Sequence, residues 1–381
     1  MHESQPTRSL KIVQVCTSKS WGGMEMHVAT LSELLHRDGQ KVWAIADPQS
    51  RLFANLADHQ IPIMPLREGG YVRPMAIRRA RQWLEQVKPD VVHVHFSRDL
   101  WWLVPAMRAM PQTPLILTKH IGTQKPKTDW LHRALYGRVQ AILAISDVIH
   151  RNIMATHPIE PQRVMTLHHG VDLQRFDPEQ HRGLEVRQQL GLSEQDVVIG
   201  IMGRLQRAKG YAEFLHMAAQ LKPRYPQCRF LMIGEASRGE EEEASAILDM
   251  IPALGLQDRV HWLGFRHDVP DVLAALDIFV FPSHAEAFGL VLIEAMAMRK
   301  PVVSSRCDGV LDIVEDRKTG LLVPPKNVDQ LVKAVVELID DPSLRERMGQ
   351  AGRQRVEAYF NQEKMLQRLK EIYAKTSLAF N

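Results

Sequence analysis

The stretch IFVFPSHAEAFGLVLIEAMA, residues 278–297, decides the fold class because it joins a short apolar strand to a helix. Residues 278–283 form an apolar run that ends in Pro-Ser, which is typical of a buried strand followed by a turn. From Gly289 onward the segment is apolar except for Glu294, which predicts a helix that begins near Gly289. A buried strand that leads into a helix is the unit of a parallel α/β sheet.

The same alternation of strand and helix extends along the chain in both directions. Helical segments separate strands predicted at 10–15, 41–46, 91–95, 115–120 and 141–146, and again at 197–203, 229–234, 260–264, 278–283 and 301–305. Two such series predict two doubly wound α/β domains, because parallel strands need helical crossovers between them. A chain of 381 residues also exceeds what one hydrophobic core usually supports.

A linker near residues 169–183 separates the two series, since it holds Gly, Asp and Pro without periodicity. We therefore predict an N-terminal Rossmann-like domain over residues 1–175 and a C-terminal one over 176–360. The last segment, 361–381, has the apolar spacing of an amphipathic helix.

Charge and composition limit which classes of partner and which cellular location the sequence supports. Residues 1–182 hold 23 Lys+Arg against 16 Asp+Glu, whereas the remainder holds 25 against 28, so the first half favours an anionic partner. Neither a nucleic-acid-binding motif nor a signal peptide or membrane span is evident, and we expect a cytoplasmic protein without nucleic acid. Cys16, Cys228 and Cys307 lack the CxxC spacing of a zinc site, and we interpret them as reduced thiols.

Gly22 and Gly23 follow the first strand and precede the first helix. Adjacent glycines let backbone approach a ligand, and a helix N-terminus favours phosphate. The spacing is not GxGxxG, so it does not support nicotinamide binding. A simple tight turn is the alternative explanation, and Asp47 is a weak candidate for binding a ribose.

A second loop, Gly203-Arg204-Leu205-Gln206-Arg207-Ala208-Lys209-Gly210, follows another strand. Arg204 and Lys209 could neutralise a diphosphate as a sugar departs from it. No Ser or Thr follows Lys209, so the loop is not a Walker A motif. The alternative is that both are solvated cations in a surface turn.

The third loop contains the carboxylates of Glu286 and Glu294, which can accept hydrogen bonds from sugar and ribose hydroxyls. The helix N-terminus beside them contributes the backbone amides of Ala287, Phe288, Gly289 and Leu290. Alternatively, Glu286 is a capping charge and Glu294 an exposed helix residue. However, Glu294 lies among apolar residues, where a buried unpaired carboxylate would be costly.

Together these motifs resemble the retaining GT-B glycosyltransferases of family 4, the glycosyl transferases group 1, over nearly the whole chain. The matching residues are Gly22-Gly23, His120, His169-Gly170-Val171-Asp172 with Phe176, Gly203-Arg204, Lys209-Gly210, Glu286 with Glu294, and Thr319 to Pro324. The resemblance implies two Rossmann-like domains that face each other across a cleft, with the terminal helix crossing back onto the first domain.

The resemblance also implies the role of each residue. Arg204 and Lys209 would bind the donor diphosphate, Glu294 the ribose, and Glu286 with the amides of residues 287–290 the sugar. His120 would contact the sugar in the transition state. The base would lie at Phe265 and Arg266, and the phosphates would lie beside Gly203 and Gly234.

The implied reaction is retaining transfer of a hexosyl group from a nucleotide-diphosphate sugar, without metal or other cofactor. We expect a UDP-sugar, with GDP-mannose as the other candidate, and a hydroxyl acceptor on a cell-envelope glycan such as polysaccharide or lipopolysaccharide, a lipid-linked sugar or a small molecule. The alternatives are a nucleotide-sugar epimerase or hydrolase of GT-B architecture and a non-catalytic nucleotide-sugar-binding protein.

Two positions depart from the family pattern. His169 replaces the usual Asn, which we expect to affect only the linker, and Asp308-Gly309 replaces the usual Gly-Gly near the donor sugar.

On the acceptor side, the basic residues of the first half lie near the apolar cluster at residues 101–104. They suggest docking to an anionic membrane surface or binding of a lipid-linked or phosphorylated acceptor. A solvated helix face and a buried Trp pair explain the same residues equally well. The basic residues are Arg73, Arg78, Arg79, Arg81, Lys125 and Lys127.

Two further polar residues, His93 and His95, lack additional zinc ligands nearby and are interpreted as core or cleft histidines.

Overall fold

A computed structural model describes residues 9–71, 73–237 and 239–378. These residues divide into two compact units: one runs up to His168 and includes the chain from Met365 onward, and the other spans His169–Lys364. The polar leader of residues 1–8 and the last three residues of the predicted terminal helix lie outside the described part of the chain.

The first unit is built on a seven-stranded sheet whose strands are all parallel, in the order β3-β2-β1-β4-β5-β6-β7. Its strands are β1 (Lys11–Cys16), β2 (Lys41–Ala46), β3 (Ile63–Pro65), β4 (Val91–Val94), β5 (Leu115–Lys119), β6 (Ala141–Ala144) and β7 (Val164–Thr166). The helices are α1 (Gly23–Arg37), α2 (Arg51–Asp58), α3 (Pro74–Val87), α4 (Leu100–Ala106), α5 (Trp130–Gly137) and α6 (Asp147–Thr156). The last helix of the chain, α15 (Gln362–Leu378), also packs here from Met365 onward.

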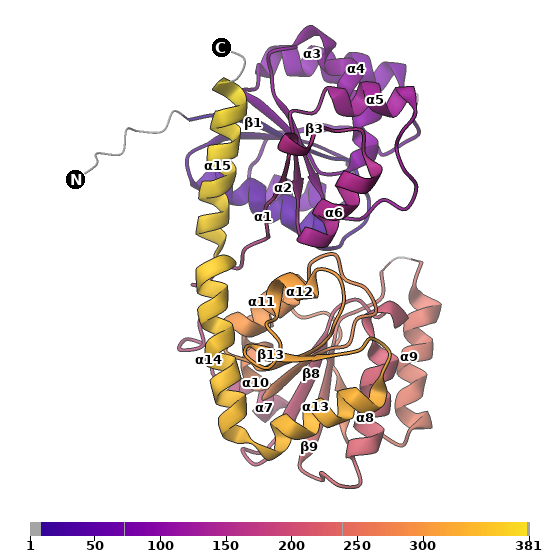
Figure 1. The fold of residues 1–381 in the computed structure, drawn as a ribbon, viewed down its shortest axis with the longest axis vertical. Helices are drawn as coiled ribbons and strands as arrows, with labels where there is room; N and C mark the ends of the chain where they lie inside the picture. The colour runs from indigo at the N-terminus through magenta and orange to yellow at the C-terminus, as the bar shows by residue number, and fades with distance from the viewer. Residues whose placement is uncertain (1–8, 72, 238, 379–381) are drawn as a thin grey trace, which may run out of the picture. The chain divides into compact units, whose positions relative to one another are not determined.

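One face of this sheet forms a core with α1, α2 and α15. Ile12 and Ile116 of the sheet, Leu35 of α1 and Tyr373 of α15 all belong to this buried cluster. Helices cover both faces of the sheet (Figure 1), which explains why its strands are continuous apolar runs.

The second unit has a six-stranded parallel sheet in the order β10-β9-β8-β11-β12-β13. Its strands are β8 (Val197–Met202), β9 (Cys228–Ile233), β10 (Val260–Trp262), β11 (Ile278–Phe281), β12 (Val302–Ser305) and β13 (Gly320–Val323). Its helices are α7 (Leu184–Gln189), α8 (Tyr211–Leu221), α9 (Glu241–Ala253), α10 (Val269–Ala275), α11 (Leu290–Ala297), α12 (Val310–Ile313), α13 (Val328–Asp340) and α14 (Pro342–Tyr359). Short 3-10 turns are η1 (Ser97–Asp99), η2 (Met107–Ala109), η3 (Pro161–Arg163) and η4 (Arg207–Lys209).

The prediction of two doubly wound parallel-sheet domains is confirmed. In each sheet the strand order reverses beside the first strand, between β1 and β4 and between β8 and β11. Ligands of open α/β sheets bind beyond the carboxyl ends of the strands at such a switch point. The loops after β1, β8 and β11 are therefore positioned for binding.

Among the described residues, no helix is both long enough and apolar enough to cross a bilayer.

Candidate active site

The carboxyl ends of β8 and β9 are held in close contact beside the candidate diphosphate loop. The hydroxyl oxygen of Tyr211 lies 2.7 Å from the carbonyl oxygen of Gly203 and 2.9 Å from that of Ile233, and its single proton is shared between them. A Cβ on Gly234 would lie 1.7 Å from the Gly203 oxygen, and Gly234 has a φ of +137°. Glycine is therefore required at Gly234, and Tyr211 is a supporting residue that the motif search missed.

The loops that follow β8 and β11 form one continuous surface. The backbone N–H of His284 donates to the carbonyl of Ala208 at 2.8 Å, and the hydroxyl of Ser283 donates to the same oxygen at 3.2 Å. Lys209 Nζ donates to Glu286 Oε2 at 2.6 Å, and both side chains are mostly buried. Lys209 is therefore not a solvated surface cation, and the structure brings two predicted site residues into direct contact.

Arg204 lies on the same loop and remains accessible. Its side chain is 47% exposed, and its Nη1 lies 3.7 Å from Glu240 Oε1. Gln206 also donates a hydrogen bond to Glu240. A cation at the surface of this loop, which the described residues hold by a long ion pair, can turn toward a bound anion.

Glu294 lies in α11, which begins directly after Gly289 as predicted. Burial raises the pKa of its carboxyl to about 7, and the charge of Arg175 lowers it only in part. Within the described chain, no side chain hydrogen-bonds this carboxyl group. A desolvated carboxyl without a protein partner is typical of a binding site, because a ligand hydroxyl can satisfy it.

The turn that carries the predicted sugar-binding amides is anchored by an aromatic side chain. Phe288 is buried, and its ring packs edge-on against His169 with centroids 5.3 Å apart and against Phe360 at 5.9 Å. Ala287 precedes this anchor, and Gly289 and Leu290 open α11. His169 thus supports this turn, so the prediction that it affects only the linker is wrong.

The second departure, Asp308-Gly309, packs directly on the same turn. The N–H of Gly309 donates to the carbonyl of Glu286 at 2.9 Å, and a Cβ on Gly309 would lie 2.3 Å from the oxygen of Ala287. Asp308 adopts a left-handed φ of +40°. The family's glycine would take this conformation without strain, so the substitution retains the backbone shape at some energetic cost.

Phe265 and Arg266, the two residues expected at the nucleotide base, differ in whether their side chains are free to contact a ligand. Phe265 is 44% exposed, and its ring contacts His267 edge-on at 4.8 Å. Arg266 forms two hydrogen bonds to Asp268, at 2.8 and 2.5 Å. Phe265 can stack on a base, whereas Arg266 acts in the structure as part of an intraloop ion pair.

In the first unit, the Gly22-Gly23 loop is closed by a carboxylate. Glu25 accepts hydrogen bonds from the N–H of Gly22 at 3.0 Å and from the hydroxyl of Ser18 at 2.5 Å. Neither glycine has a left-handed φ, and a Cβ on either would meet no atom closer than 3.7 Å. Chain geometry therefore does not require glycine at either position, and Gly22 serves as the N-cap of α1.

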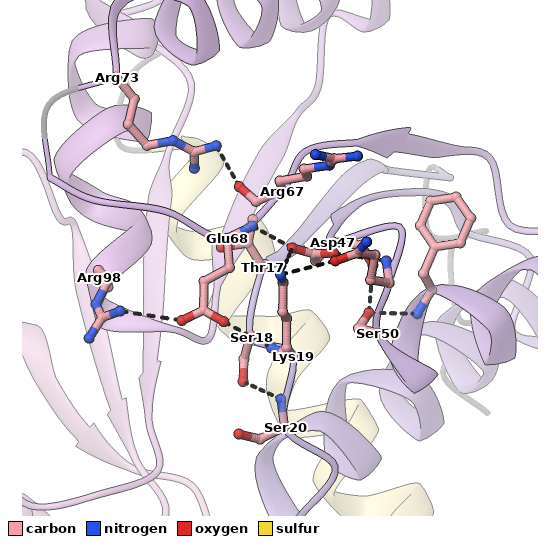
Figure 2. Close-up of polar contacts among 12 residues, drawn as sticks. Thr17, Ser18, Lys19, Ser20, Asp47, Ser50, Arg67, Glu68, Arg73 and Arg98 are labelled. Carbon is pink, nitrogen blue, oxygen red and sulfur yellow. Dashed lines mark hydrogen bonds and ion pairs between the residues drawn. The ribbon is translucent and has the colours of Figure 1, made fainter. Parts of the chain in front are cut away.

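Figure 2 shows what holds this loop beside the ends of β2 and β3. Asp47 is fully buried and accepts from the N–H groups of Gln49 at 2.8 Å and Glu68 at 2.5 Å, so it is structural rather than ribose-binding. Glu68 in turn accepts from the N–H of Lys19 and lies 3.3 Å from Arg98.

His120 directly follows β5 and is buried with two other histidines. Its Nε2 lies 3.3 Å from Nδ1 of His95, and its ring centroid lies 5.4 Å from that of His27. Burial lowers the pKa of His120 well below its usual value. His93 and His95 lie on the core side of the sheet, and each is hydrogen-bonded.

The basic and aromatic residues of the first unit have two different roles. Trp102 is buried and donates to Asp99, while Arg81 donates to the carbonyl of Pro105, so both are structural. Trp101 is partly exposed and contacts the exposed ring of Tyr71. A cavity of about 540 Å³ lies nearby, with Arg67, Arg73 and Arg79 in its lining.

The two halves of the chain match two family models. Residues 21–175 match the model described as Glycosyltransferase Family 4, and residues 184–355 match Glycosyl transferases group 1. The chain belongs to the family 4 glycosyltransferases. The two matches meet close to the boundary between the two compact units.

Curated relatives support this family 4 assignment over most of the chain. An alpha-D-kanosaminyltransferase of Streptomyces kanamyceticus is 31% identical over 69% of this chain, and the alignment spans 64% of that relative. A D-inositol 3-phosphate glycosyltransferase of Saccharomonospora viridis is 26% identical, over 98% of this chain and 95% of its own length.

Solved structures share the GT-B fold of this glycosyltransferase. A glycosyltransferase from Rickettsia africae superposes with a TM-score of 0.88 at 20% identity and covers 97% of this chain and 99% of its own. HepE from Anabaena, solved in complex with UDP, has a TM-score of 0.84 at 23% identity and covers 96% of this chain and all of its own.

Proposed function

We propose that this enzyme transfers a hexosyl group from a UDP-sugar to a hydroxyl group, with retention of anomeric configuration. The observation that carries the proposal is the arrangement at the end of β11. There the desolvated carboxyl group of Glu294, to which no side chain of the described residues hydrogen-bonds, lies on the same short segment as Glu286, the acid of the Lys209–Glu286 ion pair.

The ion pair suits a nucleotide-diphosphate donor. A diphosphate carries more negative charge than one carboxylate and would compete for Lys209, assisted by Arg204 on the same loop. Glu286, released from Lys209, would accept hydrogen bonds from the sugar, while Glu294 would accept from the ribose. The two cations would then stabilise the charge that develops on the departing diphosphate, so no metal ion is needed for that purpose.

Retention follows most simply from a same-face reaction. The glycosyl–phosphate bond breaks, the acceptor oxygen bonds to the anomeric carbon from the same side, and the departing phosphate oxygen takes the acceptor proton. In this scheme the departing phosphate takes the proton, so no protein base is needed. Glu286 and Glu294 are then free to accept hydrogen bonds from hydroxyl groups and do not act as an acid/base pair on either side of the sugar.

The choice of UDP rests on two supports. HepE was solved with UDP and with UDP-glucose, and it shares the fold of this chain. Phe265 also offers an exposed ring on which a pyrimidine can stack. GDP-mannose is the competing donor, since stacking alone does not distinguish bases.

For the acceptor, we propose an anionic molecule bound by the first unit. Arg67, Arg73 and Arg79 line a cavity whose remaining lining is mainly apolar. Among the relatives are D-inositol 3-phosphate glycosyltransferases and an alpha-maltose-1-phosphate synthase, names that contain a sugar or cyclitol phosphate. Guanidinium groups around an apolar floor suit a phosphorylated or lipid-linked glycan.

Exposed apolar side chains of the first unit suit a membrane-bound acceptor. Met75, Ile121 and Trp130 are 80%, 66% and 74% exposed, and basic side chains at Arg78 and Arg79 lie on the same helix as Met75. Exposed apolar side chains together with nearby basic side chains favour peripheral binding at the surface of an anionic bilayer.

Donor identity is tested by thermal shift with UDP, GDP, CDP and ADP, followed by transfer assays with the sugars of the nucleotide that binds. A ligand at 100 times its dissociation constant raises the free energy of unfolding by about 2.7 kcal/mol. We expect UDP to give the largest shift. Absence of a shift with all four nucleotides would refute the proposal, and sugar release without an acceptor would identify a hydrolase instead.

A further inference from the structure

A row of buried polar side chains crosses the apolar face of the first sheet and ends at His120. Gln14 of β1 pairs in register with His93 of β4, and His93 pairs with Ile116 of β5. Side chains two residues apart on a strand share a face, so His95, Thr118 and His120 follow on the same side. Tyr373 reaches this row from α15.

Each member of the row is joined to the next by a hydrogen bond. Tyr373 Oη lies 2.7 Å from His93 Nδ1 and 3.4 Å from Gln14 Nε2, and His93 Nε2 lies 2.7 Å from Thr118 Oγ1. His95 Nε2 lies 2.7 Å from Gln14 Oε1, and its Nδ1 lies 3.3 Å from His120 Nε2. All six side chains are at most 6% exposed.

The amide of Gln14 gives this network a direction. Its Oε1 can only accept, so His95 carries its proton on Nε2. His95 is only 2% exposed, and burial disfavours a charged ring. A neutral His95 accepts at Nδ1, and His120 therefore donates from Nε2.

Tyr373 holds the amide of Gln14 in its observed orientation. Its oxygen accepts from Gln14 Nε2 at 3.4 Å, which directs its proton to His93 Nδ1 at 2.7 Å, and His93 then donates from Nε2 to Thr118 Oγ1. Without this oxygen the amide could rotate by half a turn, which would reverse each donor and acceptor between Gln14 and His120.

We propose that Tyr373 of the C-terminal helix is a positioning residue that sets the tautomer and ring orientation of His120 through Gln14 and His95. The proposal rests on the proposed function, in which His120 contacts the transferred sugar. A hydrogen bond to one nitrogen of an imidazole decides which nitrogen carries the proton, and at metal-ligating histidines loss of such a partner reduces metal affinity or activity by about 10- to 100-fold.

The test compares Tyr373→Phe with the wild-type enzyme by long-range ¹H–¹⁵N spectra of protein labelled with [¹⁵N]histidine, in which His120→Asn assigns the His120 signals. We expect wild-type His120 to show the pattern of a ring protonated at Nε2 and the variant to show averaged shifts of both tautomers. kcat should fall about tenfold with little change in the KM for the donor. Tyr225→Phe, which removes a partly buried hydroxyl that donates to Asp340 at 3.2 Å in the second unit, is the control and should change neither readout.

If Tyr373→Phe fails to fold, Gln14→Met tests the same path, because it keeps the side-chain length and removes the amide. His120 signals that stay those of a single Nε2–H tautomer in a folded variant would overturn the inference. Altered signals with unchanged kcat would overturn the link between the network and catalysis. An enzyme that transfers no sugar from any donor would refute the proposed function, while the spectra would still decide whether Tyr373 controls His120.

Discussion

The ammonium nitrogen of Lys209 lies 2.6 Å from Oε2 of Glu286, so the loops after β8 and β11 are joined by an ion pair. A donor that binds Lys209 through phosphate has to displace this carboxylate. In the proposed function, the residue that would bind the leaving group and the residue that would bind the sugar are therefore coupled before the donor arrives.

Replacement of Lys209 should abolish most transfer without unfolding the enzyme. We expect Lys209→Ala to lower kcat by about 10²- to 10³-fold, because the departing diphosphate loses a preorganised cation. Steady-state kinetics with the donor identified by thermal shift measure the effect. Lys222→Ala, which breaks an ion pair of equal length with Asp258 outside the site, is the matched control. A Lys209→Ala enzyme as active as that control would refute the role of Lys209.

Glu294 should make stability depend on pH. Burial raises its pKa from 4.5 to about 7, so the folded chain binds this proton more tightly than the unfolded chain. Stability from this group is present below about pH 4.5 and is lost as the pH rises to about 7. Glu294→Gln removes the dependence and should raise the Tm by about 4 °C at pH 8, from about 1–2 kcal/mol, with little change at pH 4.

This comparison uses the enzyme without nucleotide and follows unfolding by circular dichroism between pH 4 and pH 8. A Tm difference between Glu294→Gln and wild type that stays constant across this range would show that Glu294 has an ordinary pKa.

The departure at Asp308-Gly309 gives a pair of opposite effects. Asp308→Gly should stabilise the enzyme by about 0.5 kcal/mol, since relief of the left-handed strain exceeds the entropy cost of glycine. Gly309→Ala should destabilise it by more than about 2 kcal/mol, because its Cβ would lie 2.3 Å from the oxygen of Ala287. Urea unfolding measures both changes, and equal effects of the two substitutions would contradict the geometry.

Transfer should proceed without a divalent metal ion. Arg204 and Lys209 supply the positive charge for the diphosphate, and no DxD-like pair lies beside their loop in the sequence. We expect full activity after dialysis against EDTA. Loss of activity in EDTA that manganese restores would contradict this prediction.

The exposed apolar and basic surface of the first unit should bind anionic bilayers. We expect cosedimentation with phosphatidylglycerol-containing liposomes at low salt, and release at high salt. Arg78→Glu with Arg79→Glu should weaken the partition at least about tenfold, since each basic residue near the surface contributes about 1 kcal/mol. Lys318→Glu with Arg347→Glu, in the second unit, is the charge-matched control. Absence of binding at low salt would remove the membrane proposal.

Local sequence patterns predicted the strands well because both faces of each sheet are covered. Continuous apolar runs marked every strand of four or more residues except β13, whereas β3 and β7 have only three residues each and show no periodicity. The start of the helix after Gly289 was also predicted. Its N-cap is a glycine with a left-handed φ of +107°, a conformation that glycine adopts without strain.

Contacts between distant segments could not be predicted in the same way. The Lys209–Glu286 pair depends on β8 lying beside β11, and strand order is not encoded in any local pattern. Similarly, the sequence position of Asp47 suggested a ribose-binding acid, whereas in the structure its carboxylate accepts hydrogen bonds from the N–H groups of Gln49 and Glu68. His169 looked like part of a linker because its contact with Phe288 joins residues far apart in sequence.

The path of α15 has a consequence for how the protein is made. Leu366, Leu369, Ile372 and Tyr373 fill the core of a unit whose other residues all come from the first 168 positions. N-terminal domains commonly fold while the ribosome is still extending the chain. Here the first unit can complete its core only after the second has been synthesised and the last helix has left the ribosomal tunnel. A stop codon that removes α15 should therefore leave the N-terminal half dependent on chaperones.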